Sequence, residues 1–192
     1  MAPLICLSLL SCGGKGDRVK TEETRKKTTK DIEKPRLFAT SDERFRDTQP
    51  SPIKGEAPDN WLTLPTTKFR ILNYRFGESG LGEVYVSISS GSVIENVNRW
   101  RKQFGEEALT PTSFSDVERI DIVGVSGVWM ESAGEYGAGM GAGAKPGYGL
   151  AGVVADSGGQ IITVKMIGPE NEVDAEKPAL REYVASLKIT GE

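Results

Sequence analysis

The sequence predicts an α+β fold in which a mostly antiparallel β-sheet is flanked by two or more helices. Three observations lead to this prediction. Several segments between residues 68 and 167 alternate apolar and polar residues or are rich in β-branched ones, glycine-containing turns join neighbouring segments, and two segments with helical periodicity stand apart from them. Strands in runs, with a few amphipathic helices set among them, are typical of α+β domains.

The first predicted unit is a β-hairpin. Residues 68–76 are rich in aromatic and aliphatic side chains, and residues 82–90 place Val84, Val86 and Ile88 at a spacing of two. The glycines of residues 77–82 favour a turn between the two strands.

A helix is predicted over residues 93–104. Ser92 and Glu95 have the spacing of a capping box, and Gly105 offers a left-handed C-terminal stop. Four apolar residues recur at helical spacing and should pack on the sheet: Val93, Val97, Trp100 and Phe104. We therefore expect Trp100 to belong to the core rather than to a ligand platform.

Two further pairs of strands are predicted. Residues 117–123 and 125–130 should form one antiparallel pair, and residues 147–155 and 160–167 should form another around the turn at 156–159. The glycine-rich segment 134–149 is expected to interrupt the sheet. A final helix is predicted over residues 175–186 with Asp174 as its N-cap, and Pro178 is an alternative start, because proline is tolerated only in the first turn.

The chain begins with a short apolar run that ends in Leu9-Leu10-Ser11-Cys12, which has the form of a bacterial lipobox. We therefore expect residues 1–12 to be a signal peptide that ends in this lipobox, with Cys12 acylated, palmitate included, and attached to the membrane. No Lys or Arg precedes the run, and the alternative is an apolar N-terminus with an ordinary free cysteine.

Residues 13–56 are polar and carry twelve Lys and Arg against nine Asp and Glu. Such a composition cannot bury much apolar surface, so a disordered charged tether is predicted there. The globular domain should then span residues 57–192, with twelve basic against eighteen acidic residues. This acidic balance argues against nucleic acid as a partner.

The chain contains no histidine, which removes the commonest general base and metal ligand. The remaining acid–base candidates are carboxylates, Asp116 with Glu118 and Asp121, or Glu131 with Glu135, whose spacing does not fix two carboxylates across a substrate. No calcium loop is present, and no metal site is expected.

The segment 137–145 invites comparison with a nucleotide-binding loop, because residues 139–144 fit G-x-G-x-x-A. That motif requires a helix directly after it, whereas Lys145-Pro146-Gly147 follows here. We interpret the segment as a loop and expect no cofactor.

The polar face of the predicted helix 93–104 is the best candidate for recognition of a partner. It is rich in hydrogen-bond donors, and the candidate residues are Asn98, Arg99, Arg101 and Gln103. The alternative is a solvated face on which Glu95 pairs with Arg99.

Four stretches carry a family resemblance: Asn96-Val-Asn-Arg-Trp-Arg-Lys-Gln-Phe-Gly, Tyr148-Gly-Leu-Ala-Gly-Val-Val, Thr163-Val-Lys-Met-Ile-Gly-Pro and Val184-Ala-Ser-Leu. They resemble landmarks of uncharacterised bacterial lipoproteins of the Planctomycetes and Verrucomicrobia type, over most of residues 61–189. The resemblance implies a PsbP-like α/β/α sandwich, the fold shared with Mog-type Ran-binding proteins, whose members do different things.

Together these features predict a lipid-anchored protein of the cell envelope, on the outer membrane or the periplasmic side of the inner membrane. We expect its domain to be a non-catalytic binding or structural module with an envelope protein or another envelope component as partner. The alternative is a hydrolase or small-ligand-binding domain that works with carboxylates instead of histidine. Convergent Asp or Glu side chains with raised pKa values in a deep pocket would indicate that alternative.

Overall fold

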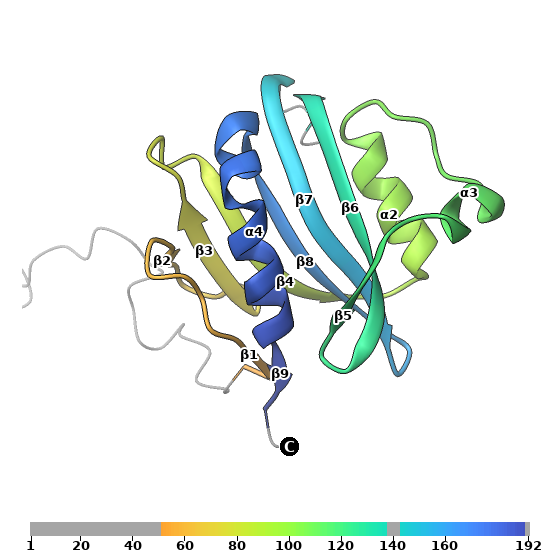
Figure 1. Ribbon diagram of the computed structural model, residues 1–192, viewed down its shortest axis with the longest axis horizontal. Helices are drawn as coiled ribbons and strands as arrows, with labels where there is room; N and C mark the ends of the chain where they lie inside the picture. The colour runs from red at the N-terminus through yellow and green to blue at the C-terminus, as the bar shows by residue number, and fades with distance from the viewer. Residues whose placement is uncertain (1–50, 138–142, 191–192) are drawn as a thin grey trace, which may run out of the picture. The chain divides into compact units, whose positions relative to one another are not determined.

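The computed structural model describes residues 51–137 and 143–190 of the chain. Its main feature is a seven-stranded antiparallel sheet in the order β2-β3-β4-β8-β7-β6-β5 (Figure 1). In that order the strands are β2 (Leu62–Thr63), β3 (Leu72–Phe76), β4 (Gly82–Ser89), β8 (Gln160–Pro169), β7 (Lys145–Ser157), β6 (Val125–Tyr136) and β5 (Arg119–Ile122). The predicted α+β class is confirmed.

Different helices cover the two faces of the sheet. Alternate residues of a strand point to opposite faces, and β7 shows the division. Ala151 and Val153 belong to a core with side chains of α4 (Glu170–Ser186), whereas Leu150 and Val154 belong to a second core with side chains of α2 (Val93–Lys102). The result is a three-layer α/β/α arrangement with one core on each side of the sheet (Figure 1).

The predicted first helix and its capping box are confirmed. The Ser92 side chain accepts a hydrogen bond from the backbone N–H of Glu95, and the Glu95 carboxylate accepts one from the backbone N–H of Ser92. Trp100 is only 6% exposed, which confirms its place in the core. It lies on Gly152 of β7, where an added Cβ would be 3.1 Å from the Trp100 ring and 2.2 Å from the carbonyl oxygen of Val164.

The last helix begins earlier than predicted. The chain runs from β8 straight into α4 at Glu170, with Pro169 as the N-cap, so neither Asp174 nor Pro178 marks the start. Acidic residues in the first turn suit the positive end of the helix dipole, which favours this earlier start. Pro178 therefore sits inside the helix. Its cost there is offset by packing, since the buried residues of this helix include Leu180, Tyr183 and Val184.

The predicted interruption at residues 134–149 was too long. β6 continues to Tyr136 and β7 already begins at Lys145, and the ladder between them shifts register between Gly134 and Tyr136. The pairing with neighbouring strands overrides the weak strand propensity of glycine. Residues 138–142 of the glycine-rich segment lie outside the described residues.

The folded part also begins earlier than the predicted boundary at residue 57. β1 (Ile53–Lys54) pairs with β9 (Lys188–Ile189) in a separate two-stranded antiparallel sheet. Ile53 is 2% exposed and belongs to the core on the α4 side. The tether prediction is therefore wrong for residues 51–56, because Ile53 is buried, both residues of β1 pair with β9, and the backbone N–H of Glu56 donates to Ser186. Residues 1–50, with Cys12 and the rest of the tether, lie outside the described residues.

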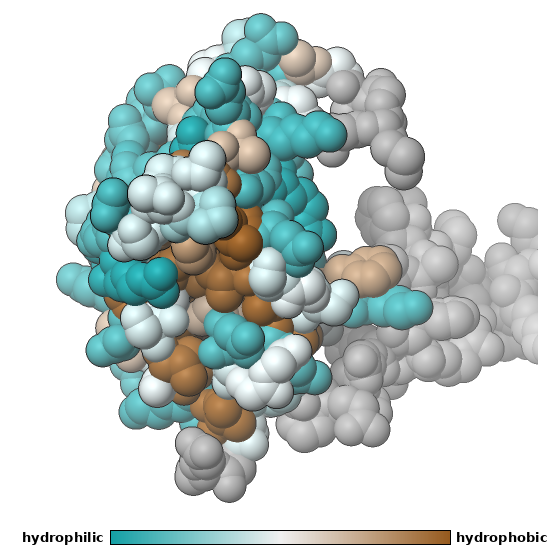
Figure 2. Space-filling view, turned by 90° about the vertical axis from the view of Figure 1, so that its right-hand side faces the viewer, coloured by the Kyte–Doolittle hydropathy of each residue, from teal (hydrophilic) through white to brown (hydrophobic). Residues whose placement is uncertain are grey.

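One short helix was not predicted. α3 (Pro111–Ser115) follows α2 and begins with a capping box formed by Thr110 and Ser113. Figure 2 shows the side of the molecule on which α2 and α3 lie, with a strip of apolar side chains between hydrophilic ones. The half-buried apolar residues that pack against the core on this side include Val93, Leu109, Phe114 and Val117. Within residues 51–137 and 143–190 no helix has the length and apolar character needed to span a bilayer.

Candidate functional site

A groove of about 430 Å³ opens on the α2 side of the sheet. α2 packs mainly over β6 and β7 rather than over the β3–β4 hairpin. The hairpin supplies one wall and the ends of β6 and β7 supply the other. The polar and aromatic side chains that line it include Arg70, Arg75, Glu83, Tyr85, Tyr136, Lys145 and Tyr148. The volume lies at the lower end of the range for small-ligand pockets, about 300–1,000 Å³.

The groove concentrates positive charge in an acidic domain. Four of the twelve basic residues of 57–192 lie in or beside it: Arg70, Arg75, Lys145 and Lys165. One carboxylate, Glu83, is among the groove residues. Its Oε2 lies 3.0 Å from Nη2 of Arg70, and its Oε1 lies 3.7 Å from Nη2 of Arg75. The groove therefore keeps a positive balance after this carboxylate is counted.

Three tyrosines give the groove flat walls. Tyr136 and Tyr148 stack with ring centroids 5.9 Å apart and an interplanar angle of 10°. The Arg70 guanidinium lies 4.1 Å from the ring centroid of Tyr85, and Nζ of Lys145 lies 5.1 Å from that of Tyr148. Cation–π contacts of this kind hold the basic groups at the walls of the groove.

Lys165 lies beside the groove and is 2% exposed. It is the cross-strand neighbour of Tyr85, and its Nζ donates a hydrogen bond to Oε1 of Gln103. Nζ also lies 5.5 Å from the ring centroid of Trp100 and 5.4 Å from that of Tyr136. Among the described residues no carboxylate forms an ion pair with Lys165.

This environment disfavours the charged amine. Burial, followed by the charges of Arg70 and Arg99, lowers the pKa of Lys165 to about 7. Burial likewise raises the pKa of Tyr85 to about 12 and raises the pKa of Tyr136. Both phenols are therefore neutral hydrogen-bond donors at physiological pH.

The four residues predicted for partner binding are not one open surface. The Asn98 amide exchanges hydrogen bonds of 3.1 and 2.7 Å with the backbone of Leu109. Arg101 pairs with Glu106 at 2.8 Å, which ties α2 to the loop that follows it.

Gln103 holds Lys165, and Arg99 donates to the side chain of Asn96 rather than to Glu95. Arg99 is exposed, whereas the other three residues of the predicted set are half-buried. The proposal of a partner surface on this helix therefore depends mainly on Arg99. Gln103 lies beside the groove instead, as the hydrogen-bond partner of Lys165.

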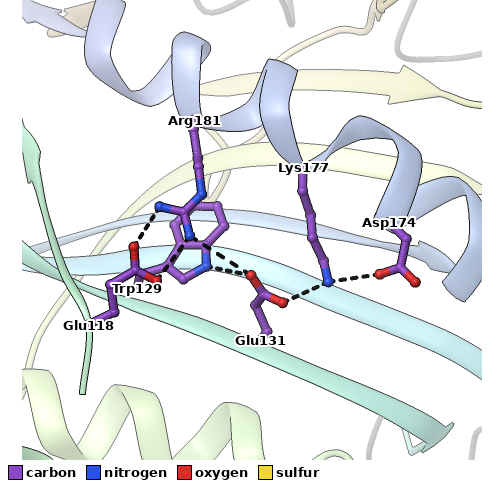
Figure 3. A network of polar contacts seen from close by, with 6 residues as sticks. All are labelled: Glu118, Trp129, Glu131, Asp174, Lys177 and Arg181. Carbon is purple, nitrogen blue, oxygen red and sulfur yellow. Dashed lines mark hydrogen bonds and ion pairs between the residues drawn. The ribbon is translucent and has the colours of Figure 1, made fainter. Parts of the chain in front are cut away.

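The structure brings together one carboxylate from each of the two sets considered from the sequence. Glu118 and Glu131 meet on the α4 side of the sheet, around Arg181 (Figure 3). Arg181 donates to both carboxylate oxygens of Glu118, at 2.8 and 3.0 Å, and its guanidinium lies 4.0 Å from the ring centroid of Trp129. Hydrogen bonding from Arg181 is the main cause that lowers the pKa of Glu118.

Glu131 is held in the same network. Its carboxylate accepts hydrogen bonds from Lys177 and from the Trp129 indole, both at 2.7 Å, and Lys177 also pairs with Asp174 (Figure 3). Burial opposes ionisation of Glu131, but the hydrogen bonds and nearby cations outweigh it, and its pKa is lowered. These carboxylates are ionised ion-pair partners and not general acids. The residues that the structure describes contain no group of three Cys, Asp or Glu placed to hold a metal ion.

Sequence reasoning missed the groove, although one signal was present. Lys165 is a single basic residue in the apolar run of β8, between Val164 and Met166. Alternation then places Lys165 on the same face as its neighbours across the ladder, Tyr85 on β4 and Gly152 on β7. The strand pairing needed for this inference is not fixed by the sequence.

No protein-family model matches this chain, and no curated protein matches it. Solved structures resemble it at low identity. CyanoP, the PsbP protein of Synechocystis sp. PCC 6803, is 13% identical with a TM-score of 0.43, over 74% of this chain and 95% of that one. LpqN, described as involved in cell envelope biogenesis of Mycobacterium tuberculosis, is 14% identical with a TM-score of 0.41, over 72% and 83%.

A protein of Bacteroides thetaiotaomicron is 12% identical with a TM-score of 0.45 over 75% of this chain. The match covers 47% of that protein, so the chain spans about half its length. The neighbours thus include a PsbP protein and a protein described as involved in cell envelope biogenesis. At these levels of similarity, nothing about ligand, partner or activity is transferred to this chain.

Proposed function

We propose that this chain is a lipid-anchored protein of the cell envelope whose domain binds a ligand of the envelope without catalysis. The observation that carries the binding role is the groove on the α2 side. It combines a suitable volume, flat tyrosine walls and a local excess of positive charge in a domain that is otherwise acidic.

Binding is favoured over carboxylate-based catalysis by the state of the carboxyl groups and by the lack of histidine. The chain has no histidine. Within the described residues, the carboxyl groups with a shifted pKa are Glu95, Glu118 and Glu131, and all three shifts are downward. A general acid at neutral pH needs the opposite shift. The alternative of a carboxylate-based hydrolase therefore has no support from these residues.

The anchor is proposed from the lipobox. Stable membrane attachment needs two signals or several acyl chains, and a triacylated Cys12 would supply several chains. Intact-mass measurement of the protein extracted from bacterial membranes tests this step. We expect a chain that begins at Cys12 and carries acyl groups; an unmodified Cys12 would contradict the anchor but not the binding role.

The binding role is tested by thermal unfolding of the full chain, extracted in detergent, with a panel of small organic anions and their neutral amides. A ligand that binds the folded state raises Tm by mass action. We expect the increase to shrink in Lys145→Gln and to persist in Lys188→Gln, a matched change at an exposed lysine of β9. A ligand that raises Tm equally in both variants binds outside the groove. If every ligand that raises Tm behaves in this way, the assignment of the groove as the binding site is refuted.

A further inference from the structure

We propose that the groove selects a small planar carboxylate, a monoanion with an aromatic or unsaturated body, and that Lys165 takes up a proton as this ligand binds. This inference rests on the proposed function, because it names the ligand class of the same groove.

Charge complementarity requires an anion. Arg70 and Arg75 share the single carboxylate of Glu83, whereas no described carboxylate pairs with Lys145 or Lys165. A neutral or cationic ligand would leave this excess unmatched. An anion would replace the solvent around these groups with a charge-assisted hydrogen bond.

The tyrosines define the shape of the ligand. Tyr136 and Tyr148 are nearly parallel, and Tyr85 stands on the opposite wall with Arg70 against its ring. Flat walls of this kind make their best contact with a flat body, because offset stacking brings the most atoms within van der Waals distance. The rim residue Leu81, 57% exposed, adds an apolar contact at the mouth.

The surroundings favour a carboxylate over a phosphate. Phosphate sites commonly use a helix N-terminus or a nest of backbone N–H groups. None of the residues that line the groove belongs to a described helix, so no helix N-terminus is directed into it. The end of α2 that lies beside Lys165 is its C-terminal end, at Gln103, where the partial charge is negative. A dianion is disfavoured there. The Glu83 carboxylate already shows that Arg70 and Arg75 can accommodate this group.

The groups that face Lys165 decide its response to a ligand. They come from four parts of the chain. Tyr85 and, two residues away, Glu83 lie on β4, and Tyr136 lies at the end of β6. α2 contributes Arg99, Trp100 and Gln103, and the loop before β3 contributes Arg70. The two arginines and burial hold the amine partly neutral near pH 7. A bound carboxylate supplies the missing negative charge, so it shifts the amine toward its protonated form.

This coupling has a defined sign. The ligand carboxyl, with a pKa near 4, is ionised throughout the range from pH 6 to pH 9. Below pH 7 Lys165 is already protonated and binding needs no proton. Above pH 7 the complex must take one up, so affinity falls by up to about tenfold per pH unit.

Isothermal titration calorimetry with 2-naphthoate tests the inference on the full chain in detergent. Measurements in HEPES and Tris, whose heats of ionisation differ, give the number of protons taken up per ligand. We expect about half a proton at pH 7 and nearly one at pH 8. The neutral amide, 2-naphthamide, and inorganic phosphate are expected to bind at least about tenfold more weakly at pH 6.

Lys165→Met keeps the volume of the side chain and removes the titrating amine. We expect it to fold, to bind 2-naphthoate about tenfold more weakly at pH 6, and to take up no proton. Lys145→Gln should weaken binding but keep the proton uptake, and Lys188→Gln should change neither. Proton uptake that survives in Lys165→Met would overturn the role of this lysine.

The remaining outcomes separate this inference from the proposed function. Equal binding of 2-naphthoate and 2-naphthamide, with loss of both in Lys145→Gln, would overturn the carboxylate while supporting the groove as a binding site. Tighter binding of phosphate would overturn the carboxylate in the same way. Binding of 2-naphthoate that is unchanged in Lys145→Gln and Lys165→Met would refute both the inference and the assignment of the groove.

Discussion

Replacement of Trp100 by alanine is expected to remove a large share of the stability of the domain. Trp100 is 6% exposed and joins α2 to β7 through its contact with Gly152. Because Gly152 has no side chain, it cannot fill the space that the indole leaves. A truncation of this kind costs about 3–5 kcal/mol, against a total stability of about 5–15 kcal/mol for a typical domain.

The matched control is Arg99→Ala, one residue away on the same helix. Arg99 is exposed, and the hydrogen bond it donates goes to Asn96, which keeps its bonds to Ser89, Ser90 and Ser92. The expected cost is therefore below about 1 kcal/mol.

Urea unfolding followed by far-UV circular dichroism measures both variants. With a slope of about 1–3 kcal/mol per molar urea, Trp100→Ala should lower the midpoint by at least about 1 M or leave the chain unfolded, and Arg99→Ala should shift it slightly. If Arg99→Ala lowers the midpoint as much as Trp100→Ala, the facing of α2 and the packing argument are both wrong.

Four further outcomes are expected. Gly152→Ala should cost about 1–3 kcal/mol in a thermal melt, because the new methyl would meet backbone and the Trp100 ring, and an unchanged Tm would contradict that close approach. Ile53→Ala should cost about 2–5 kcal/mol in urea unfolding, as a buried apolar truncation, whereas a negligible cost would mean that residues 51–56 do not dock. Lys165→Met should raise Tm at pH 7–8. Folding lowers the pKa of Lys165 from 10.5 to about 7, so the unfolded chain binds more protons than the folded chain between these two pH values. The stability of the wild type therefore rises with pH in this range, and the variant should lose this pH dependence. Arg181→Gln should cost about 1 kcal/mol at pH 7. Folding lowers the pKa of Glu118, so the stabilisation by the Arg181–Glu118 pair is present above the ordinary carboxyl pKa and is lost as pH falls through the pKa of Glu118 in the folded chain. The difference in Tm between Arg181→Gln and wild type should therefore disappear in acid.

Local signals in the sequence were sufficient for several elements. The capping box at Ser92 and Glu95 fixed the start of α2, because its two hydrogen bonds join residues three positions apart and need no distant partner. Alternation in β4 gave its strand type and its apolar face, and the β-branched run in β8 gave its strand type, for the same reason. The helical stripe around Trp100 gave its buried position.

Distant partners decided the elements that were predicted wrongly. α4 begins at Glu170 because β8 leads directly into it and its apolar residues pack on the sheet, which outweighs the internal Pro178. Ile53 is ordered because β9, some 130 residues later in the chain, offers an unpaired edge. Neither partner is visible from the local composition of the tether or of the helix.

The candidate site shows the same division. The sequence by itself determined that histidine chemistry is absent, that residues 57–192 are acidic, and that a lysine stands within the apolar run of β8. Tertiary structure alone decided that Lys165 adjoins Tyr85, Gln103 and Tyr136, which come from three other parts of the chain. Spacing along a strand fixes the face of each residue, whereas the register between strands fixes its neighbours. The charge and burial that give the groove its chemistry therefore arise only when the sheet is assembled.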